Sequence, residues 1–131
     1  MKHLAKSVLT LVIACNALAA SSQSKWVTPA ASAAVKNPIS ADATSLAEAK
    51  NIYKTTCAPC HGDKGRGDGP AAVALNPKPA DHSSKEIQAE SDGSLFWKMT
   101  TGKGAMQAYK TQLSDKQRWE LVNYIRTLKK K

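Results

Sequence analysis

The chain has 131 residues, enough for one domain with extensions but short for two domains. It carries 19 Lys and Arg against 10 Asp and Glu, a formal net charge of +9. Such an excess of basic residues is typical of proteins that bind nucleic acids, anionic surfaces or acidic proteins. Because the N-terminus predicts export, we expect no nucleic acid partner and favour acidic proteins. Lysines that only keep a small domain soluble are the alternative.

The first 19 residues have the organisation of a secretion signal. Lys2 and Lys6 precede an apolar run at residues 8–14. This run is far shorter than the about 20 apolar residues that a membrane-spanning helix needs. Residues 17–19, Ala-Leu-Ala, match the small-x-small pattern at which signal peptidase cleaves. Cleavage there predicts a signal peptide at residues 1–19.

A second processing route is open, because residues 12–15, Val-Ile-Ala-Cys, resemble a bacterial lipobox. On this route Cys15 becomes a lipidated N-terminus and anchors the protein at the periplasmic face of a membrane. Both routes predict a periplasmic domain. On both routes Cys15 is lost as a free thiol, so Cys57 and Cys60 are the only free thiols that remain. No further cysteine is left to form a disulfide framework.

Residues 20–43 are rich in Ala, Ser, Thr and Pro, and we predict a linker or an extension that wraps the domain. Trp26 is the one large apolar residue of this stretch that we expect to pack on the domain. The domain itself is predicted at residues 44–131, and its regular secondary structure is predicted to be entirely helical. Its first helix is expected to start at a capping box of Ser45 and Glu48. It should end at the cysteine motif, because Pro59 disfavours the helical conformation of the preceding residue.

Four further helices are expected, and no stretch alternates like a strand. They are a short helix at residues 71–75 after a Gly-rich loop at 62–70, a short helix after Ser84, a helix from Ser91 or Asp92 to Gly102, and a last helix that opens at the capping box of Ser114 and Gln117. The apolar faces are formed by Leu46, Ala49, Ile52 and Tyr53, by Leu95, Phe96 and Met99, and by Leu121, Tyr124, Ile125 and Leu128. The fold class is therefore predicted as all-α.

These helices provide little apolar volume, and Phe96 is the only phenylalanine. Domains of this size usually need disulfides, a metal or a prosthetic group to be stable. Because the cysteine count excludes disulfides, we expect a bound group to fill the centre of the domain.

The motif CAPCHG, residues 57–62, has three possible interpretations: a dithiol redox pair, a structural zinc site or a haem attachment site. A dithiol redox pair would normally open a helix after a strand, and a structural zinc site needs four ligands, which the spacing of His61 and His82 does not complete. In the third reading the two thiols bind the vinyl groups of haem, and His61 reaches the iron. Only this reading uses every residue of the motif and agrees with export.

With this motif, residues 44–131 resemble the class I single-haem c-type cytochromes, especially bacterial periplasmic members. The family has a helix before CxxCH, then a methionine-bearing loop, then a C-terminal helix that crosses the first helix. The stretches GDGPAAVALNPKPAD and SDGSLFWKMTTGKGAMQAY carry the resemblance further. It implies a cytochrome c fold, one haem c bound covalently to Cys57 and Cys60, His61 as an axial iron ligand, and Ala49 at the helix crossing.

The resemblance also implies Met106 as the second axial ligand. Residues 104–109, GAMQAY, match the family's Gly-x-Met-Pro-x-aromatic loop except that Gln107 replaces proline. This departure predicts a less rigid loop and an iron–sulfur bond that is easier to displace. Met99 lies at core spacing and is expected to pack, and His82, a third ligand option, is expected to be a surface histidine.

Other pocket residues follow from the resemblance. The His61 ring is expected to donate its N–H to the carbonyl of Pro70. Trp97, Tyr109 and Arg66 are candidates for bonding a haem propionate, with core packing as the alternative role of Trp97.

The implied function is that of a monomeric one-electron carrier between periplasmic or membrane-bound respiratory proteins, and not of an enzyme. Lys64, Arg66, Lys103 and Lys110 are predicted to form a basic docking ring for acidic partners around the haem edge. Two alternatives stay open. One is a haem subunit of an oxidoreductase complex, tethered through residues 20–43 or a lipid on Cys15. The other is an open-site sensor or peroxidase-like haem protein, if Met106 is not bound.

Overall fold

A computed structural model of the chain describes residues 25–131. The predicted signal peptide and the lipobox at Cys15 lie outside these residues. Within the described part the secondary structure is helical, as predicted, apart from one isolated β-bridge between Lys103 and Met106. No helix of residues 25–131 is long and apolar enough to cross a bilayer.

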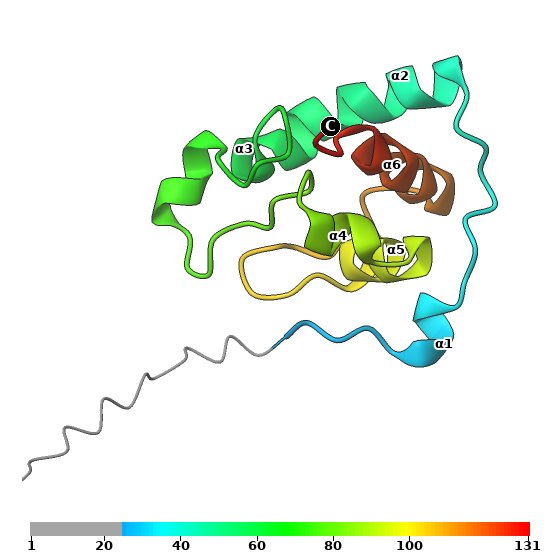
Figure 1. Ribbon diagram of the computed structural model, residues 1–131, viewed down its shortest axis with the longest axis horizontal. Coiled ribbons are helices and arrows are strands. Elements are labelled where there is room, and N and C mark those ends of the chain that lie inside the picture. Colours follow the sequence, from blue (N-terminus) through cyan, green and yellow to red (C-terminus); the bar gives the residue numbers. More distant parts are fainter. Residues whose placement is uncertain (1–24) are drawn as a thin grey trace, which may run out of the picture.

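The elements follow one another in the order shown in Figure 1. They are α1 (Ala30–Ala33), α2 (Ala43–Ile52), the π-helical turn η1 (Tyr53–Cys57), α3 (Ala58–His61), the 3-10 turn η2 (Pro70–Ala74), α4 (Lys85–Ala89), α5 (Asp92–Thr101) and α6 (Asp115–Thr127). The predicted caps Ser91 and Ser114 each accept a hydrogen bond from the first turn of their helix, and within the predicted cap signal at residues 83–86 it is Ser84 that does so. The first helix starts earlier than predicted, because Asp42 caps it and Ser45 is the third helical residue of the capping box.

The helix that leads to the cysteine motif does not end there, which corrects the prediction. Ala58 keeps a helical conformation in front of Pro59, with φ −60° and ψ −30°. The π turn η1 separates α2 from α3, so that Pro59 falls in the first turn of a new helix, where its missing N–H breaks no hydrogen bond. As a result Cys57, Cys60 and His61 lie on consecutive helical segments.

The core forms where α2 and η1 meet α6. Ala49 and Tyr53 are fully buried in one apolar cluster with Leu121, Val122 and Ile125. A small side chain at position 49 allows the two helices to approach closely. The expected position of Ala49 at the helix crossing agrees with this packing.

Residues 25–42 wrap the domain on the side of α5 and α6 (Figure 1). Asn37 donates to the carbonyl of Trp119 at 3.2 Å and to Asn123 Oδ1 at 2.9 Å, and Asn123 donates to the carbonyl of Ile39 at 2.9 Å. A Cβ atom on Gly93 would lie 2.2 Å from the carbonyl oxygen of Ser32, so only glycine admits this close approach of α1 to α5. Of the two predicted arrangements of this stretch, the described part adopts the wrapping one.

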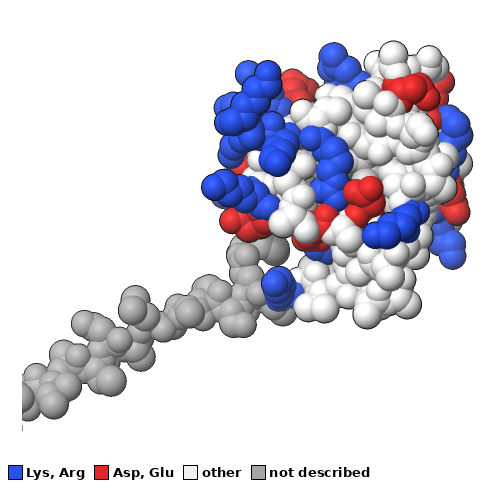
Figure 2. All heavy atoms as spheres, turned by 45° about the vertical axis from the view of Figure 1, so that its right-hand side comes forward, with Lys and Arg blue, Asp and Glu red and all other residues white. Residues whose placement is uncertain are grey.

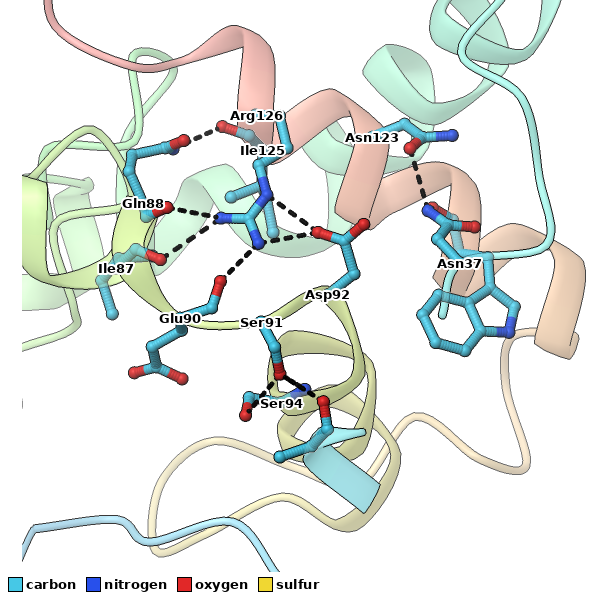
Figure 3. A network of polar contacts seen from close by, with 12 residues as sticks. Asn37, Ile87, Gln88, Glu90, Ser91, Asp92, Ser94, Asn123, Ile125 and Arg126 are labelled. Atoms are coloured by element: carbon cyan, nitrogen blue, oxygen red, sulfur yellow. Dashed lines mark hydrogen bonds and ion pairs between the residues drawn. The ribbon is translucent and has the colours of Figure 1, made fainter. Parts of the chain in front are cut away.

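Arg126 of α6 joins the last helix to the α4–α5 junction (Figure 3). Its guanidinium donates to the carbonyl oxygen of Glu90 at 2.6 Å and to Asp92 Oδ1 at 2.7 Å. Longer bonds of 3.4 and 3.3 Å reach the carbonyls of Ile87 and Gln88. The arginine thus satisfies backbone acceptors that the short helix α4 leaves open at its end.

We expect Ala49→Leu to lower the free energy of unfolding by about 1–3 kcal/mol, because a larger side chain overpacks the α2–α6 contact. The exposed Ala47, on the same helix, provides the matched control. Ala47→Leu should change the stability by less than about 0.5 kcal/mol. Guanidinium unfolding of the haem-loaded protein measures both, and equal effects of the two variants would contradict the packing at position 49.

Candidate functional site

The two cysteines of the motif are half-buried and unbonded to each other. Burial raises the pKa of Cys57 to about 12, and the nearby Cys60 contributes to the same direction. The Cys57 thiol is therefore neutral at physiological pH. Reactive dithiol pairs have the opposite property, a lowered pKa. The environment of Cys57 thus lacks the thiolate character that dithiol exchange requires.

His61 is buried, and its Nδ1 lies 2.9 Å from the carbonyl oxygen of Ala80. Burial lowers the pKa of His61, although the bond to Ala80 opposes this effect. With Nδ1–H as the donor, Nε2 carries the free lone pair that an iron ligand requires. The ring nitrogen Nδ1 does face a backbone carbonyl, but this is the carbonyl of Ala80, so the predicted acceptor, the carbonyl of Pro70, is wrong.

The acceptor differs because the Gly-rich loop brings a later segment against His61. His82 donates its backbone N–H to the carbonyl of Gly65 at 2.6 Å. A Cβ on Gly67 would lie 2.5 Å from the carbonyl oxygen of Pro79, so the loop and this segment are in direct backbone contact. Pro70 instead starts the exposed turn η2. Ala80 was not predicted as part of the site, because a backbone acceptor leaves no signal in its residue type.

His82 is not a surface residue, which corrects another prediction. Its exposed fraction is 9%. Its ring stacks on that of His61, with centroids 4.0 Å apart and planes at 18°, and its Nδ1 lies 2.9 Å from the Tyr53 hydroxyl. Burial, and then the positive charge of a protonated His61, lower the pKa of His82 to about 3. A neutral imidazole therefore supports the flat face of His61.

Met106 lies in a tight turn between α5 and α6. Lys103 and Met106 exchange backbone hydrogen bonds of 2.8 and 3.1 Å. Gly102 has a φ of +64°, and a Cβ there would lie 2.6 Å from the Met106 carbonyl oxygen. The Met106 side chain is half-buried against the apolar cluster, whereas Met99 is a buried member of that cluster. The interpretation of Met99 as a packing residue agrees with this position.

Tyr109 connects the Met106 turn to the cysteine motif. Its N–H donates to the carbonyl of Met99 at 2.9 Å, and its hydroxyl lies 3.4 Å from the carbonyl oxygen of Thr56. Burial raises the pKa of Tyr109, and the two cysteines act in the same direction. The structure therefore brings the turn that carries Met106 to the side of the motif where the thiols lie.

Gln107, which replaces the family's proline, is exposed. Its amide lies 3.4 Å from the side-chain oxygen of Gln112. A hydrogen bond from the Gln107 side chain also lowers the pKa of Tyr109, against the larger effect of burial. The turn at this position is thus held by side-chain contacts in place of a proline ring.

The remaining predicted residues are distributed around the site. Trp97 is half-buried and packs edge-on against Trp26, with ring centroids 6.3 Å apart, as expected for Trp26. Arg66 is exposed and lines two surface hollows, neither of which includes a cysteine of the motif. Lys103 lies 5.9 Å from the Trp26 ring centroid. The structure does not place Lys103 or Lys110 with Arg66 and Lys64 in either hollow.

Taken together, the donor set fits a covalently attached haem. It comprises two thiols, one of them held neutral by burial, an imidazole oriented through Nδ1, and a thioether on a turn tied to the motif. Haem attachment requires thiols and an imidazole at this spacing, and a thioether is an ordinary second ligand.

Comparison with known proteins gives the same answer. A family model described as cytochrome C oxidase, cbb3-type, subunit III matches residues 44–125. A protein of the Kuenenia stuttgartiensis reducing HAO-like protein complex Kustc0457/Kustc0458 is similar in structure, with a TM-score of 0.62 and 31% identity over 71% of this chain. The match covers 47% of that protein, so this chain corresponds to about half of its length.

A second similar structure is the KustC0563 c-type cytochrome, with a TM-score of 0.55 and 25% identity. That match covers 63% of this chain and 98% of the cytochrome. No protein of curated function matches the chain in sequence.

We expect His82→Ala to destabilise the haem-loaded protein by about 2–5 kcal/mol, because it opens a cavity beside His61 and leaves the buried Tyr53 hydroxyl without its partner. His82→Phe keeps a ring against His61 and loses only the hydrogen bond, so it should cost about 1–3 kcal/mol. Guanidinium unfolding measures both variants. If His82→Ala changed the stability by less than about 0.5 kcal/mol, the buried position of His82 would be contradicted.

Proposed function

The chain belongs to the c-type cytochrome family described as cytochrome C oxidase, cbb3-type, subunit III, and on this premise we propose that it is a one-electron carrier whose iron has His61 and Met106 as axial ligands. One haem c is bound covalently, and haem electron transfer is the activity of such domains. The observation that carries the assignment of Met106 is the attachment of its turn to the cysteine motif through Tyr109.

The residues of the motif have separate tasks in this proposal. Cys57 and Cys60 hold the porphyrin through thioether bonds, and His61 binds the iron through Nε2. The bond from His61 Nδ1–H to the Ala80 carbonyl fixes the tautomer and increases the donor strength of Nε2. The bound haem supplies a reversible one-electron couple, and a methionine ligand raises its reduction potential.

With His61 and Met106 both bound, the iron would have no position left for a substrate. This argument favours a carrier over an enzyme or a sensor. The open-site alternative requires the release of Met106 from the iron. It is favoured by Gln107, which replaces proline in the exposed part of the Met106 turn and is expected to make this turn less rigid. Trp97 and Tyr109 remain the proposed partners of the haem propionates, whereas Arg66 is exposed and lines surface hollows that include no cysteine of the motif.

We place the carrier in the periplasm, between donors and acceptors of a respiratory chain. Its formal charge of +9, which falls to +7 when Lys2 and Lys6 leave with the signal segment, favours partners with acidic surfaces. A haem subunit of a larger complex is the second candidate. It is favoured by the similarity to a protein from a reducing HAO-like complex, and a lipid on Cys15 or the extension before the domain would provide the tether.

Absorption spectra of the haem-loaded protein test the proposed ligand. The oxidised wild type should show a methionine–iron charge-transfer band, and its reduced form should not bind carbon monoxide. Met106→Ala should lose the band and bind carbon monoxide, because the sixth position is then open. Met99→Leu is the matched control, since this methionine is buried in the apolar cluster, and it should keep the band.

If the wild type itself lacked the band and bound carbon monoxide readily, the open-site alternative would replace the carrier. If the band were lost in Met99→Leu and kept in Met106→Ala, the ligand assignment would be wrong. The mass of the mature N-terminus separates the cleaved form from the lipidated form.

A further inference from the structure

The loop after the cysteine motif and the C-terminal end of α6 enclose a surface hollow of about 280 Å³. Lys64 and Arg66 line it from the loop, and Lys129 and Lys130 line it from the C-terminal segment. Lys130 is held there by two contacts, a bond of 2.8 Å to Asp81 Oδ2 and a backbone bond of 3.3 Å to the Ser83 carbonyl. We call these four residues the proximal basic site, because they lie on the His61 side of the motif.

The charge of this site is strongly positive and largely uncompensated. Four cationic side chains face one carboxylate in its lining, that of Asp63. Within residues 25–131, the side chains of Lys64, Arg66 and Lys129 make no hydrogen bond or ion pair, and all three residues are exposed. The charges are also unevenly distributed over the molecular surface. Figure 2 shows one face, on part of which many Lys and Arg side chains are gathered.

The floor of the hollow is close to the axial histidine. Leu128, which lines the hollow, lies beside Gly65, since a Cβ on that glycine would be 2.9 Å from Leu128 Cδ1. The same Cβ would be 2.9 Å from His82 Cβ. His82 in turn stacks on His61 at 4.0 Å. A partner in this hollow is therefore separated from the iron ligand by a short series of packed side chains.

We propose that the proximal basic site is the docking site for an acidic segment of a redox partner protein, and that electrons pass there on the His61 side of the haem. This inference rests on the proposed carrier function and adds the position and chemistry of the partner. Charge complementarity selects the occupant: several carboxylates close together would meet three unpaired cations around Leu128. It differs from the predicted docking ring, because Lys103 and Lys110 do not line this hollow.

The first test is binding of a hexaglutamate peptide to the full, haem-loaded, ¹⁵N-labelled chain, followed by NMR. Amide shifts should be concentrated at residues 64–66 and 127–130, and they should disappear at high salt because the attraction is electrostatic. Shifts centred on residues 103–110, or no saturable shift at low salt, would overturn the proposed position.

The second test is oxidation of the ferrous protein by ferricyanide, in which one electron leaves the haem and ferrocyanide is formed. The combined change of Lys64, Arg66 and Lys129 to Glu should slow this reaction at least about tenfold at low ionic strength, and the difference should shrink at high salt. Lys130 is left unchanged, because it pairs with Asp81.

Two control variants separate the local effect from net charge. The change of Lys25, Lys36 and Lys50 to Glu alters the net charge equally, and these exposed residues line neither hollow. The change of Lys103 and Lys110 to Glu tests the other candidate face. Either control slowing the reaction as much as the triple change would overturn the proposed site. If the wild type did not reduce ferricyanide at all, the carrier function would fail instead.

Discussion

The backbone contact between the Gly-rich loop and the segment that follows η2 is the constraint on which the site depends. The bond of 2.6 Å from the His82 N–H to the Gly65 carbonyl brings Ala80 to His61 Nδ1 and the His82 ring to the face of His61. The His61 imidazole is thus held at its edge by the Ala80 carbonyl and on its face by the His82 ring, without a contribution from a metal. Oriented ligands of this kind need less reorganisation when the metal changes its charge, which suits electron transfer.

The core of the domain is thin, and two features outside it add support. Residues 25–42 cover α5 and α6 with hydrogen bonds from Asn37 and Asn123, and Trp26 packs against Trp97. Arg126 gathers the carbonyls at the end of α4 and the carboxylate of Asp92 (Figure 3). A small helical domain that builds its centre around a prosthetic group has to hold its periphery by such polar contacts.

The two sides of the haem site differ in the kind of structure that surrounds them. On the His61 side, backbone contacts and stacked rings are rigid, and the surface above them is strongly basic. On the Met106 side, a turn with Gln107 in place of proline is held by side-chain hydrogen bonds and by Tyr109. His61 is thus held more rigidly than Met106, so in the proposed carrier an adjustment of the iron ligands is expected at the methionine.

The sequence by itself determined the helical class, the caps at Ser91 and Ser114, and the attachment motif, because each depends on residues within a few positions of one another. It also predicted Met99 as a core residue from its spacing, and Met99 is buried, whereas Met106 as an iron ligand stays a prediction. The acceptor of His61, the burial of His82 and the meeting of Lys64 and Arg66 with Lys129 and Lys130 were decided only by the tertiary structure. Each of these features joins segments that are distant in sequence, through backbone atoms or surface charges. Such contacts leave no recognisable pattern in a single sequence.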